Sequence, residues 1–537
     1  MQVIRLAQWE CGDLAALLRE ARTIQDRLRS STPNSLSKER LAKTIAKLVF
    51  EGKINAALKL LEQNSRGILP LSQSTINELT RKHPDATEAE ASVLINGPIP
   101  FVDPVMFQNI TESTIMNAAL KTKGSSGPSG IDADGWKRIL VSKNFATVGR
   151  DLRCAIATFA QKVSTIEIEA TMENDRRCTN LEAYLACRLI PLDKNPGIRP
   201  IGIGEVLRRI VGKAILSVIK PDIISSAGNL QLCAGQASRC EAAVHAIRDI
   251  FEAQSTDAVL LVDADNAFNS LNRAVLLHNI RYLCPPMATY IRNCYNTPSR
   301  LFVLGGTELL SSERTTQGDP LAMPVYAIGI IPLLQVIKPD NDSVKHVAFA
   351  DDLSGAGNLA PLRTWWDNLV TVGPKLGYYP KASKSWLVVK PEVEDEAHLI
   401  FAGTDIKITT EGRQCLGGFV GSEAGQSEYI DGLVDSWCNQ LILLSKIARS
   451  EPHAAYAAFT SGFKHKLTYY IRTIPNIKQQ LTKVDEVIDN TLIPAITEGH
   501  ICTVEERLLL SLPVKKGGLA VPMFTNIADF EYLNSRY

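Results

Sequence analysis

Two adjacent carboxylates stand at a turn between two apolar segments. The stretch from Val344 to Gly357 reads VKHVAFADDLSGAG, and Asp351 and Asp352 lie at its centre. Its pattern predicts a strand, a tight turn and a second strand. Asp-Asp is also ordinary turn chemistry, so the pair alone does not identify a site. Neighbouring carboxylates at a strand end repel each other, and a divalent cation relieves that repulsion.

A second acidic strand end lies upstream, in Leu260–Ser270 (LLVDADNAFNS), where an apolar run precedes Asp263. The two strand ends can meet only if their strands are neighbours in one sheet. A cluster of Asp263, Asp351 and Asp352 would offer oxygen ligands without Cys or His, which favours Mg²⁺, or Mn²⁺, over Zn²⁺. Two such ions roughly 3.5–4 Å apart serve phosphoryl transfer. Asp265 falls on the same strand face as Asp263 and competes with it as a ligand.

The acidic segments resemble the catalytic boxes of reverse transcriptases of the non-LTR retrotransposon (LINE-like) and group II intron type. FADD at Phe349–Asp352 is similar to the family's F/Y-x-D-D box, and Asp263 stands where its first catalytic aspartate belongs. The resemblance implies that Asp263, Asp351 and Asp352 are catalytic and bind the metal ions. It implies that the carbonyl of Ala264 is a further metal ligand.

The same resemblance assigns a role to Phe268, five residues beyond Asp263 on the segment that leaves the strand. In the family, this aromatic ring occupies the space that a ribose 2′-hydroxyl would need, and it therefore favours dNTPs over rNTPs. A core aromatic is the plainer interpretation of the same residue.

Two basic residues flank a Pro-Gly turn in the segment 189–215, LIPLDKNPGIRPIGIGEVLRRIVGKAI. We expect a hairpin whose tip presents Lys194 and Arg199 to an anion, because guanidinium and ammonium groups bind phosphate. Surface charges near a turn are the alternative. This sequence resembles the fingers motif of the family. The resemblance implies that Arg199 contacts the triphosphate of the incoming nucleotide, and Lys194 is the weaker candidate for the same role. KTKGSSGPSGID at Lys121–Asp132 resembles another fingers segment.

Three further boxes complete the resemblance. Gln317 and Gly318 open the box in TTQGDPLAMP, which is similar to the family's QG-x-P-L-S-P box and implies contact with a template-paired nucleotide. Lys384 precedes Ser385 as in the family's N-x-x-K-S/T segment, which implies a place near the nucleotide phosphates; an exposed lysine at a strand edge is the alternative. Leu416–Phe419 (LGGF) resembles the primer-grip hairpin.

The boxes occur in the family's order over residues 121–420, which implies a fold and its boundaries. We expect an α+β right-hand polymerase with an antiparallel-sheet palm, mixed fingers and a helical thumb. The expected divisions are a helical N-terminal extension at 1–95, fingers at 96–255, a palm with the catalytic aspartates at 256–425, and a helical thumb or C-terminal region at 426–537. Within the extension, Leu41–Leu61 predicts a helical hairpin interrupted at Glu51-Gly52.

Composition bounds the partners and the compartment. The 537 residues carry a net charge of +1, so a nucleic-acid groove must come from local clustering of basic residues. The sequence has eleven cysteines and no C-x-x-C motif. We expect Cys233, Cys240 and His245 to be buried side chains and not zinc ligands. With no secretory or transmembrane segment in the sequence, we expect an intracellular protein of the nucleus or cytoplasm that does not bind membranes.

The function that the resemblance implies is RNA-directed DNA polymerase activity. An RNA template, a DNA or RNA primer and dNTPs are the expected partners, and Mg²⁺ is the expected cofactor. An RNA-dependent RNA polymerase shares such a palm, although it more often carries Gly before its aspartate pair and a polar residue in place of Phe268. An inactive domesticated remnant that only binds RNA is the third hypothesis.

Overall fold

A computed structural model gives the structure of the protein. It describes residues 38–62, 67–173, 176–194, 197–303, 306–313, 315–316, 318–339 and 343–536, with short stretches between 4 and 23. The chain divides into two compact units. One unit comprises residues 1–63, 436–466 and 482–523, and the other comprises 64–435, 467–481 and 524–537. The candidate site lies wholly in the second unit.

A five-stranded sheet carries the acidic segments. Its strands, in spatial order, are β11 (Lys407–Thr409), β10 (Trp386–Val389), β5 (Ala258–Val262), β9 (Asp352–Gly357) and β8 (Val344–Phe349). β10, β5, β9 and β8 run antiparallel to their neighbours, while β11 is parallel to β10. The predicted antiparallel sheet is therefore confirmed for four strands, and the edge strand β11 departs from it.

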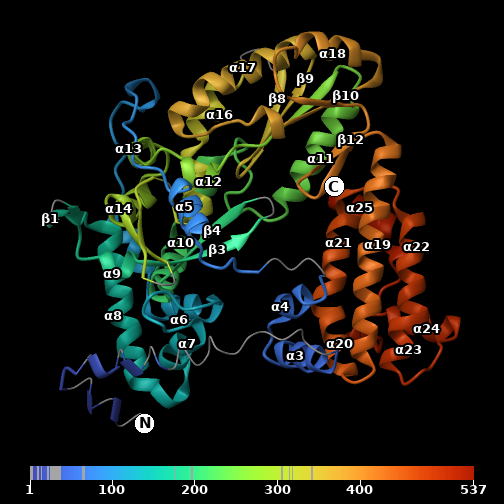
Figure 1. Ribbon diagram of the computed structural model, residues 1–537, viewed down its shortest axis with the longest axis horizontal. Helices are drawn as coiled ribbons and strands as arrows, with labels where there is room; N and C mark the ends of the chain where they lie inside the picture. The colour runs from blue at the N-terminus through green and yellow to red at the C-terminus, as the bar shows by residue number, and fades with distance from the viewer. Residues whose placement is uncertain are drawn as a thin grey trace. The chain divides into compact units, whose positions relative to one another are not determined.

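Each face of this sheet is covered by a helix, because both sets of alternating strand residues are apolar. Leu260 and Val262 of β5 pack with Trp365 of α17 (Leu359–Leu376). Val259 of β5 packs with Phe251 of α11 (Arg239–Glu252) on the other face. Figure 1 shows α17 and α11 on opposite sides of the strands.

A second sheet of four strands has the order β4 (Ile198–Gly204), β3 (Cys187–Asp193), β6 (Ser299–Val303) and β7 (Glu308–Ser311). β3 and β4 form the hairpin that the sequence predicts around the Pro-Gly turn. The short helix α5 (Gln73–Arg81) packs on this sheet, since Leu79 shares a buried cluster with Leu189 and Ile198. α10 (Val206–Ala227) follows β4.

Helices make up most of the remaining structure of the second unit. They are α6 (Glu112–Lys121), α7 (Ala133–Val141), α8 (Ala146–Thr165), α9 (Glu182–Leu185), α12 (Ala267–Ser270), α13 (Arg273–Leu283), α14 (Pro285–Tyr295), α15 (Ala322–Gly329), α16 (Ile331–Ile337), α18 (Glu394–Ile400) and α25 (Phe524–Arg536). Two small hairpins are β1 (Thr171–Glu173) with β2 (Arg176–Cys178), and β12 (Gly412–Cys415) with β13 (Gly418–Gly421).

The first unit contains α3 (Lys38–Phe50), α4 (Ile54–Lys59), α20 (Pro452–Ala458), α23 (Ile493–Ile496) and α24 (Val504–Ser511). Three helices contribute residues to both units: α19 (Glu423–Ala448), α21 (Lys464–Thr473) and α22 (Lys478–Val487). The predicted break at Glu51-Gly52 is confirmed, because α3 ends just before it. The four sequence-based divisions stay a prediction. None of the described helices has the length and apolar character needed to cross a membrane.

Candidate active site

The two adjacent aspartates lie at the tip of the β8–β9 hairpin. Phe349 pairs with Asp352, which leaves Ala350 and Asp351 as the two turn residues. Ala350 adopts a left-handed backbone conformation, with φ of 57°, that costs a non-glycine residue about 1–2 kcal/mol. The predicted strand, tight turn and strand are confirmed.

A buried glutamine holds this turn, and no sequence motif points to it. The amide N–H of Ala350 donates to Oε1 of Gln231 at 2.9 Å, and Nε2 of Gln231 donates to the Ala350 carbonyl at 3.1 Å. The hydroxyl of Tyr378 donates to the carbonyl of Asp351 at 3.1 Å. These bonds fix the backbone on either side of the Asp351 side chain and offset the strain at Ala350.

The first aspartate follows the end of β5, beside the same hairpin. The antiparallel register ends at Val262 opposite Leu353, so the next step along both strands places Asp263 across from Asp352. The amide of Asp263 donates to Oγ of Ser385 at 3.2 Å, and its carbonyl accepts from the amide of Lys381 at 2.8 Å. The prediction that the two acidic strands are neighbours is confirmed.

The three carboxylates influence one another electrostatically. Loss of hydration, followed by the charges of Asp351 and Asp263, raises the pKa of Asp352 to about 6. Burial and the nearby charge of Asp263 raise the pKa of Asp351, while Lys194 and Arg199 oppose that rise. Burial is the larger cause of both pKa shifts, and the neighbouring negative charges add to it. The carboxylate oxygens of Asp263, Asp351 and Asp352 do not all lie within 4.8 Å of one another.

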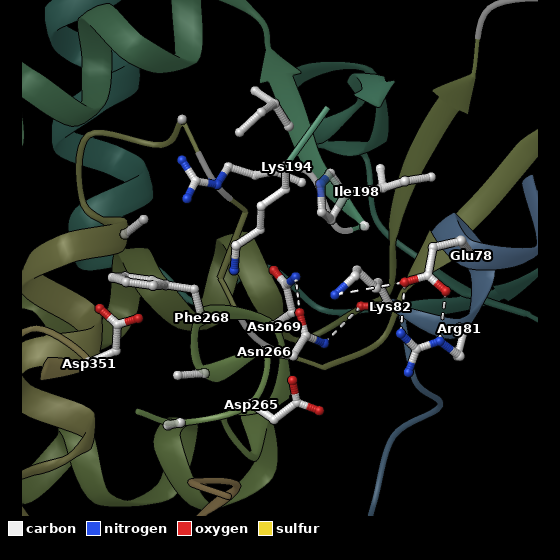
Figure 2. A pocket seen from close by; sticks show the side chains of 18 of the residues that line it. Glu78, Arg81, Lys82, Lys194, Ile198, Asp265, Asn266, Phe268, Asn269 and Asp351 are labelled. Atoms are coloured by element: carbon white, nitrogen blue, oxygen red, sulfur yellow. Dashed lines mark hydrogen bonds and ion pairs between the residues drawn. The ribbon is translucent and has the colours of Figure 1, made fainter. Parts of the chain in front are cut away.

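A cavity of about 750 Å³ opens beside Asp351. Figure 2 shows Asp351 and Phe268 on one side of it and Lys82 with Arg81 on the other. Of the residues predicted from the sequence, the following line it: Lys194, Arg199, Ala264, Phe268, Gly318, Asp351 and Lys384. Asp263 and Asp352 stand outside the lining, and Gln317 lies outside the described residues.

The hairpin between β3 and β4 supplies the basic wall of the cavity. Lys194 closes the hairpin, since its amide donates to the Gly197 carbonyl at 3.0 Å, and Arg199 lies opposite Leu192 in the register. Both cations are close enough to Asp351 to act on its pKa. The structure therefore brings the two predicted phosphate-binding residues to the carboxylate tip.

Phe268 lies in the short helix α12 rather than on an irregular segment. Its ring is tilted by 31° against the ring of Tyr326, with the centroids 4.5 Å apart. Tyr326 is fully buried, and this contact fixes the position of the Phe268 ring on the cavity wall. Asn266 and Asn269 line the same wall, and Nδ2 of Asn269 donates to Oδ1 of Asn266.

Lys384 is paired in the structure. Its Nζ lies 3.7 Å from Oδ1 of Asp265, and both side chains are about half exposed. The sequence suggested Asp265 as an alternative metal ligand to Asp263. In the structure, Asp265 lies on the cationic side of the cavity. The amide of Asp265 donates to the Tyr379 carbonyl at 2.9 Å, which orders the segment beyond β5.

A buried ion pair positions the turn that carries Gly318. Asp319 accepts from Arg208 and from the hydroxyl of Tyr295, and its other oxygen accepts from the Leu321 amide at 2.9 Å. The side chains of Arg208 and Asp319 are each only 2% exposed, so the bond is shielded from water. Removing either partner of such a buried pair leaves an uncompensated charge.

Gly318 itself is required by close packing. It has φ of 104°, and a Cβ at this position would lie 2.8 Å from the carbonyl oxygen of Gly202 in β4. We expect Gly318→Ala to lose about 1–3 kcal/mol of stability, because the turn must move away from the hairpin. Thermal unfolding measures the loss.

Gly306→Ala is the matched control for this prediction. Gly306 has a similar φ of 98° but has open space around the position of a Cβ. Backbone strain is therefore common to both variants, whereas the clash is specific to Gly318. Equal losses of stability in the two variants would contradict a steric requirement for glycine at position 318.

We expect Asp352→Asn to stabilise the metal-free protein at neutral pH. Between the ordinary value of 3.8 and the raised pKa of about 6, the folded protein keeps a proton that the unfolded chain releases. Wild-type stability therefore falls as pH rises through this window, and the variant avoids the loss. After discounting for solvent screening, the gain at pH 7.5 is about 1 kcal/mol.

Thermal unfolding in a metal chelator at about pH 7.5 and about pH 4 tests this expectation. The Asp352→Asn protein should unfold at a higher temperature than wild type at the higher pH and at a similar temperature at the lower pH. Asp405→Asn, at an exposed aspartate before β11, is the control. A gain of the same size at both pH values would mean that ionisation of Asp352 is not its cause.

Cys233 and His245 are buried, as predicted, whereas Cys240 is only partly buried. Burial raises the pKa of the Cys233 thiol to about 11, and Cys240 and His245 bond to Tyr469 and Ser535, respectively. In the part of the chain that the structure describes, one compact group has the donors of a metal site. It consists of His500, Cys502 and Glu506 in the first unit.

Comparisons with known proteins give matches among solved structures. No family model matches the sequence, and no curated protein matches it. Among solved structures, the chain is similar to an insertion-loop deletion mutant of the RNA-dependent RNA polymerase of a human picorbirnavirus. The identity is 10% and the TM-score 0.34, over 87% of this chain and 92% of that chain. A likeness of this size assigns neither a fold family nor an activity.

Proposed function

We propose that the protein is a nucleic-acid polymerase, specifically an RNA-directed DNA polymerase that extends a primer 3′-hydroxyl with dNTPs. The observation that carries the proposal is the convergence of Asp263, Asp351 and Asp352 at one end of the five-stranded sheet. Beside them lies a cavity that Lys194 and Arg199 line. Acidic groups for cations and basic groups for phosphates are the two requirements of nucleotidyl transfer.

The carboxylates fit a site for Mg²⁺ or Mn²⁺. All donors are oxygens, and the pKa values of Asp351 and Asp352 are raised by burial and, to a smaller extent, by neighbouring carboxylates, both of which a bound cation would offset. Asp263, Asp351, Asp352 and the Ala264 carbonyl would hold the ions. The chemistry supplied by bound Mg²⁺ is activation of the primer hydroxyl and neutralisation of charge on the triphosphate and leaving group.

The other residues bind and orient the substrates. Arg199 and Lys194 bind phosphates from the hairpin side of the cavity, as charge-assisted hydrogen-bond donors. The ring of Phe268, held against Tyr326, limits the space beside the sugar. Gly318 lets the backbone of its turn lie close to the nucleotide. In this assignment, the five-stranded sheet belongs to the palm at 256–425, the hairpin of β3 and β4 to the fingers at 96–255, and the helices of residues 426–537 to the thumb.

RNA-dependent RNA synthesis is the second candidate. The observation that favours it is the presence of Asn266 and Asn269 on the cavity wall beside Phe268. Side-chain amides are able to hydrogen-bond a ribose 2′-hydroxyl, which an aromatic ring cannot do. A protein that only binds RNA is less well supported, because clustered carboxylates beside the cavity repel phosphates unless cations are bound.

Primer extension with the purified protein and Mg²⁺ tests the proposal. The template should be RNA in one arm and DNA in another, with dNTPs or rNTPs supplied separately. We expect metal-dependent extension on RNA with dNTPs. Extension with rNTPs alone would favour the second candidate. RNA binding that needs no metal, without extension under any of these conditions, would contradict polymerase activity.

A further inference from the structure

A helix that precedes the fingers segments adds basic residues to the candidate active site. The C-terminal end of α5 places Glu78, Arg81 and Lys82 on the cavity wall. The helix is anchored on the four-stranded sheet by Leu79, which is fully buried. These residues lie within the N-terminal extension predicted at 1–95, and they belong to none of the sequence motifs described above.

Lys82 is attached to the segment that follows the first catalytic aspartate. Its backbone carbonyl accepts a hydrogen bond from Nδ2 of Asn266 at 3.4 Å. Asn266 adopts a left-handed conformation, with φ of 53°, and opens α12. The Lys82 backbone is thus tied to the cavity wall that carries Ala264 and Phe268.

The carboxylate of Glu78 is shared between two cations, Arg81 and Lys82, and it lies closer to Arg81. Both Nε and a terminal nitrogen of Arg81 bond to the carboxylate of Glu78, at 2.8 and 2.7 Å. Nζ of Lys82 lies 3.9 Å from that carboxylate, beyond hydrogen-bond distance. The side chain of Lys82 is 17% exposed and that of Arg81 66%. Burial, together with the positive charges of Arg81 and Lys194, lowers the pKa of Lys82, although Glu78 and Asp265 oppose the shift.

The cations form a continuous path away from the carboxylates. Lys194 lies near enough to Asp351 to act on its pKa, and it also acts on the pKa of Lys82. Figure 2 shows Lys194 extending between Asp351 on one side and Lys82 on the other. A polyphosphate chain held by cations at Asp351 would extend in this direction, because this is where the basic side chains follow one another.

We propose that Lys82 contacts the terminal phosphates of the incoming nucleotide and of the pyrophosphate product. Arg81, at the exposed edge of the cavity, lies on the path of pyrophosphate release. The inference rests on the proposed function and deepens it, because it assigns a phosphate-binding residue outside the motifs of the fingers. The template backbone is the competing ligand for these cations, and the experiment distinguishes the two.

The test compares steady-state primer extension by three full-length proteins. They are the wild type, Lys82→Ala and Lys82→Arg. We expect Lys82→Ala to raise the KM for nucleotide about tenfold, the effect of one charge-assisted hydrogen bond. The inhibition constant of pyrophosphate should rise by a similar factor, with little change in kcat or in the KM for primer–template. Lys82→Arg should recover most of the lost affinity.

Lys143→Ala is the matched control, because Lys143 is exposed and lies outside the cavity. If Lys82→Ala does not fold, Lys82→Gln removes the same charge with less loss of packing and carries the same expectation. An unchanged KM for nucleotide, or a rise confined to primer–template, would overturn the inference while leaving the polymerase proposal intact. A wild-type chain without Mg²⁺-dependent extension would overturn both.

Discussion

Asp351→Asn is expected to reduce the kcat of primer extension at least about a thousandfold, with little change in folding. A thousandfold loss corresponds to about 4 kcal/mol of transition-state stabilisation, within the range for removing a group that acts on the developing charge. Asn keeps the size of the side chain and removes its charge. The turn should survive, because its hydrogen bonds to Gln231 and Tyr378 come from the backbone.

The matched comparison is Asp265→Asn, since Asp265 is another carboxylate on the cavity wall but lies on its cationic side. It pairs with Lys384 in the structure, and we expect a much smaller loss. Both variants should be assayed over a range of Mg²⁺ concentrations. A large loss in Asp265→Asn with near-normal activity in Asp351→Asn would reverse the assignment of the ligands.

Phe268→Ala is expected to reduce the preference for dNTPs over rNTPs at least about tenfold. Adding or removing a side chain that fills the space beside the sugar changes the discrimination between dNTPs and rNTPs by about 1–3 kcal/mol. The ring is held by Tyr326, with centroids 4.5 Å apart, so it cannot move aside freely to admit a 2′-hydroxyl. The ratio of kcat/KM values for a dNTP and the matching rNTP measures the effect.

Tyr326→Phe is the control for this prediction. Its hydroxyl is buried without a hydrogen-bond partner among the described residues, so the substitution keeps the ring contact and removes an unsatisfied group. We expect discrimination close to that of wild type and equal or greater stability. A wild-type enzyme that already prefers rNTPs, or discrimination unchanged in Phe268→Ala, would contradict the steric role of Phe268.

The parts of the site that follow local rules are predictable from the sequence. Apolar runs ending in carboxylates predicted β5, β8 and β9, and the requirement that the acidic strand ends meet predicted neighbouring strands. The Pro-Gly turn predicted the hairpin that carries Lys194 and Arg199. Each prediction depends on residues close together in the chain or on the alternation of strand side chains.

The supporting residues were not predictable in this way. Gln231 reaches Ala350 from a segment far away in sequence, and a lone glutamine carries no signal of burial. Arg208 stands beside Arg209 in the same helix, and no local pattern distinguishes the arginine that is buried against Asp319 from its more exposed neighbour. Lys82 reaches the cavity because α5 packs on a sheet. These positions are set by tertiary packing, which no local pattern encodes.

Anomalous diffraction at the manganese edge, from crystals of the protein soaked in Mn²⁺, shows directly whether the three carboxylates bind metal ions. We predict two peaks roughly 3.5–4 Å apart at the ends of β5 and the β8–β9 hairpin. The carboxylates of Asp263 and Asp351 would hold these ions, and the Asp351→Asn protein should lose at least one peak. Manganese bound elsewhere, for example only at His500, Cys502 and Glu506, with no density between Asp263 and Asp351, would contradict the account.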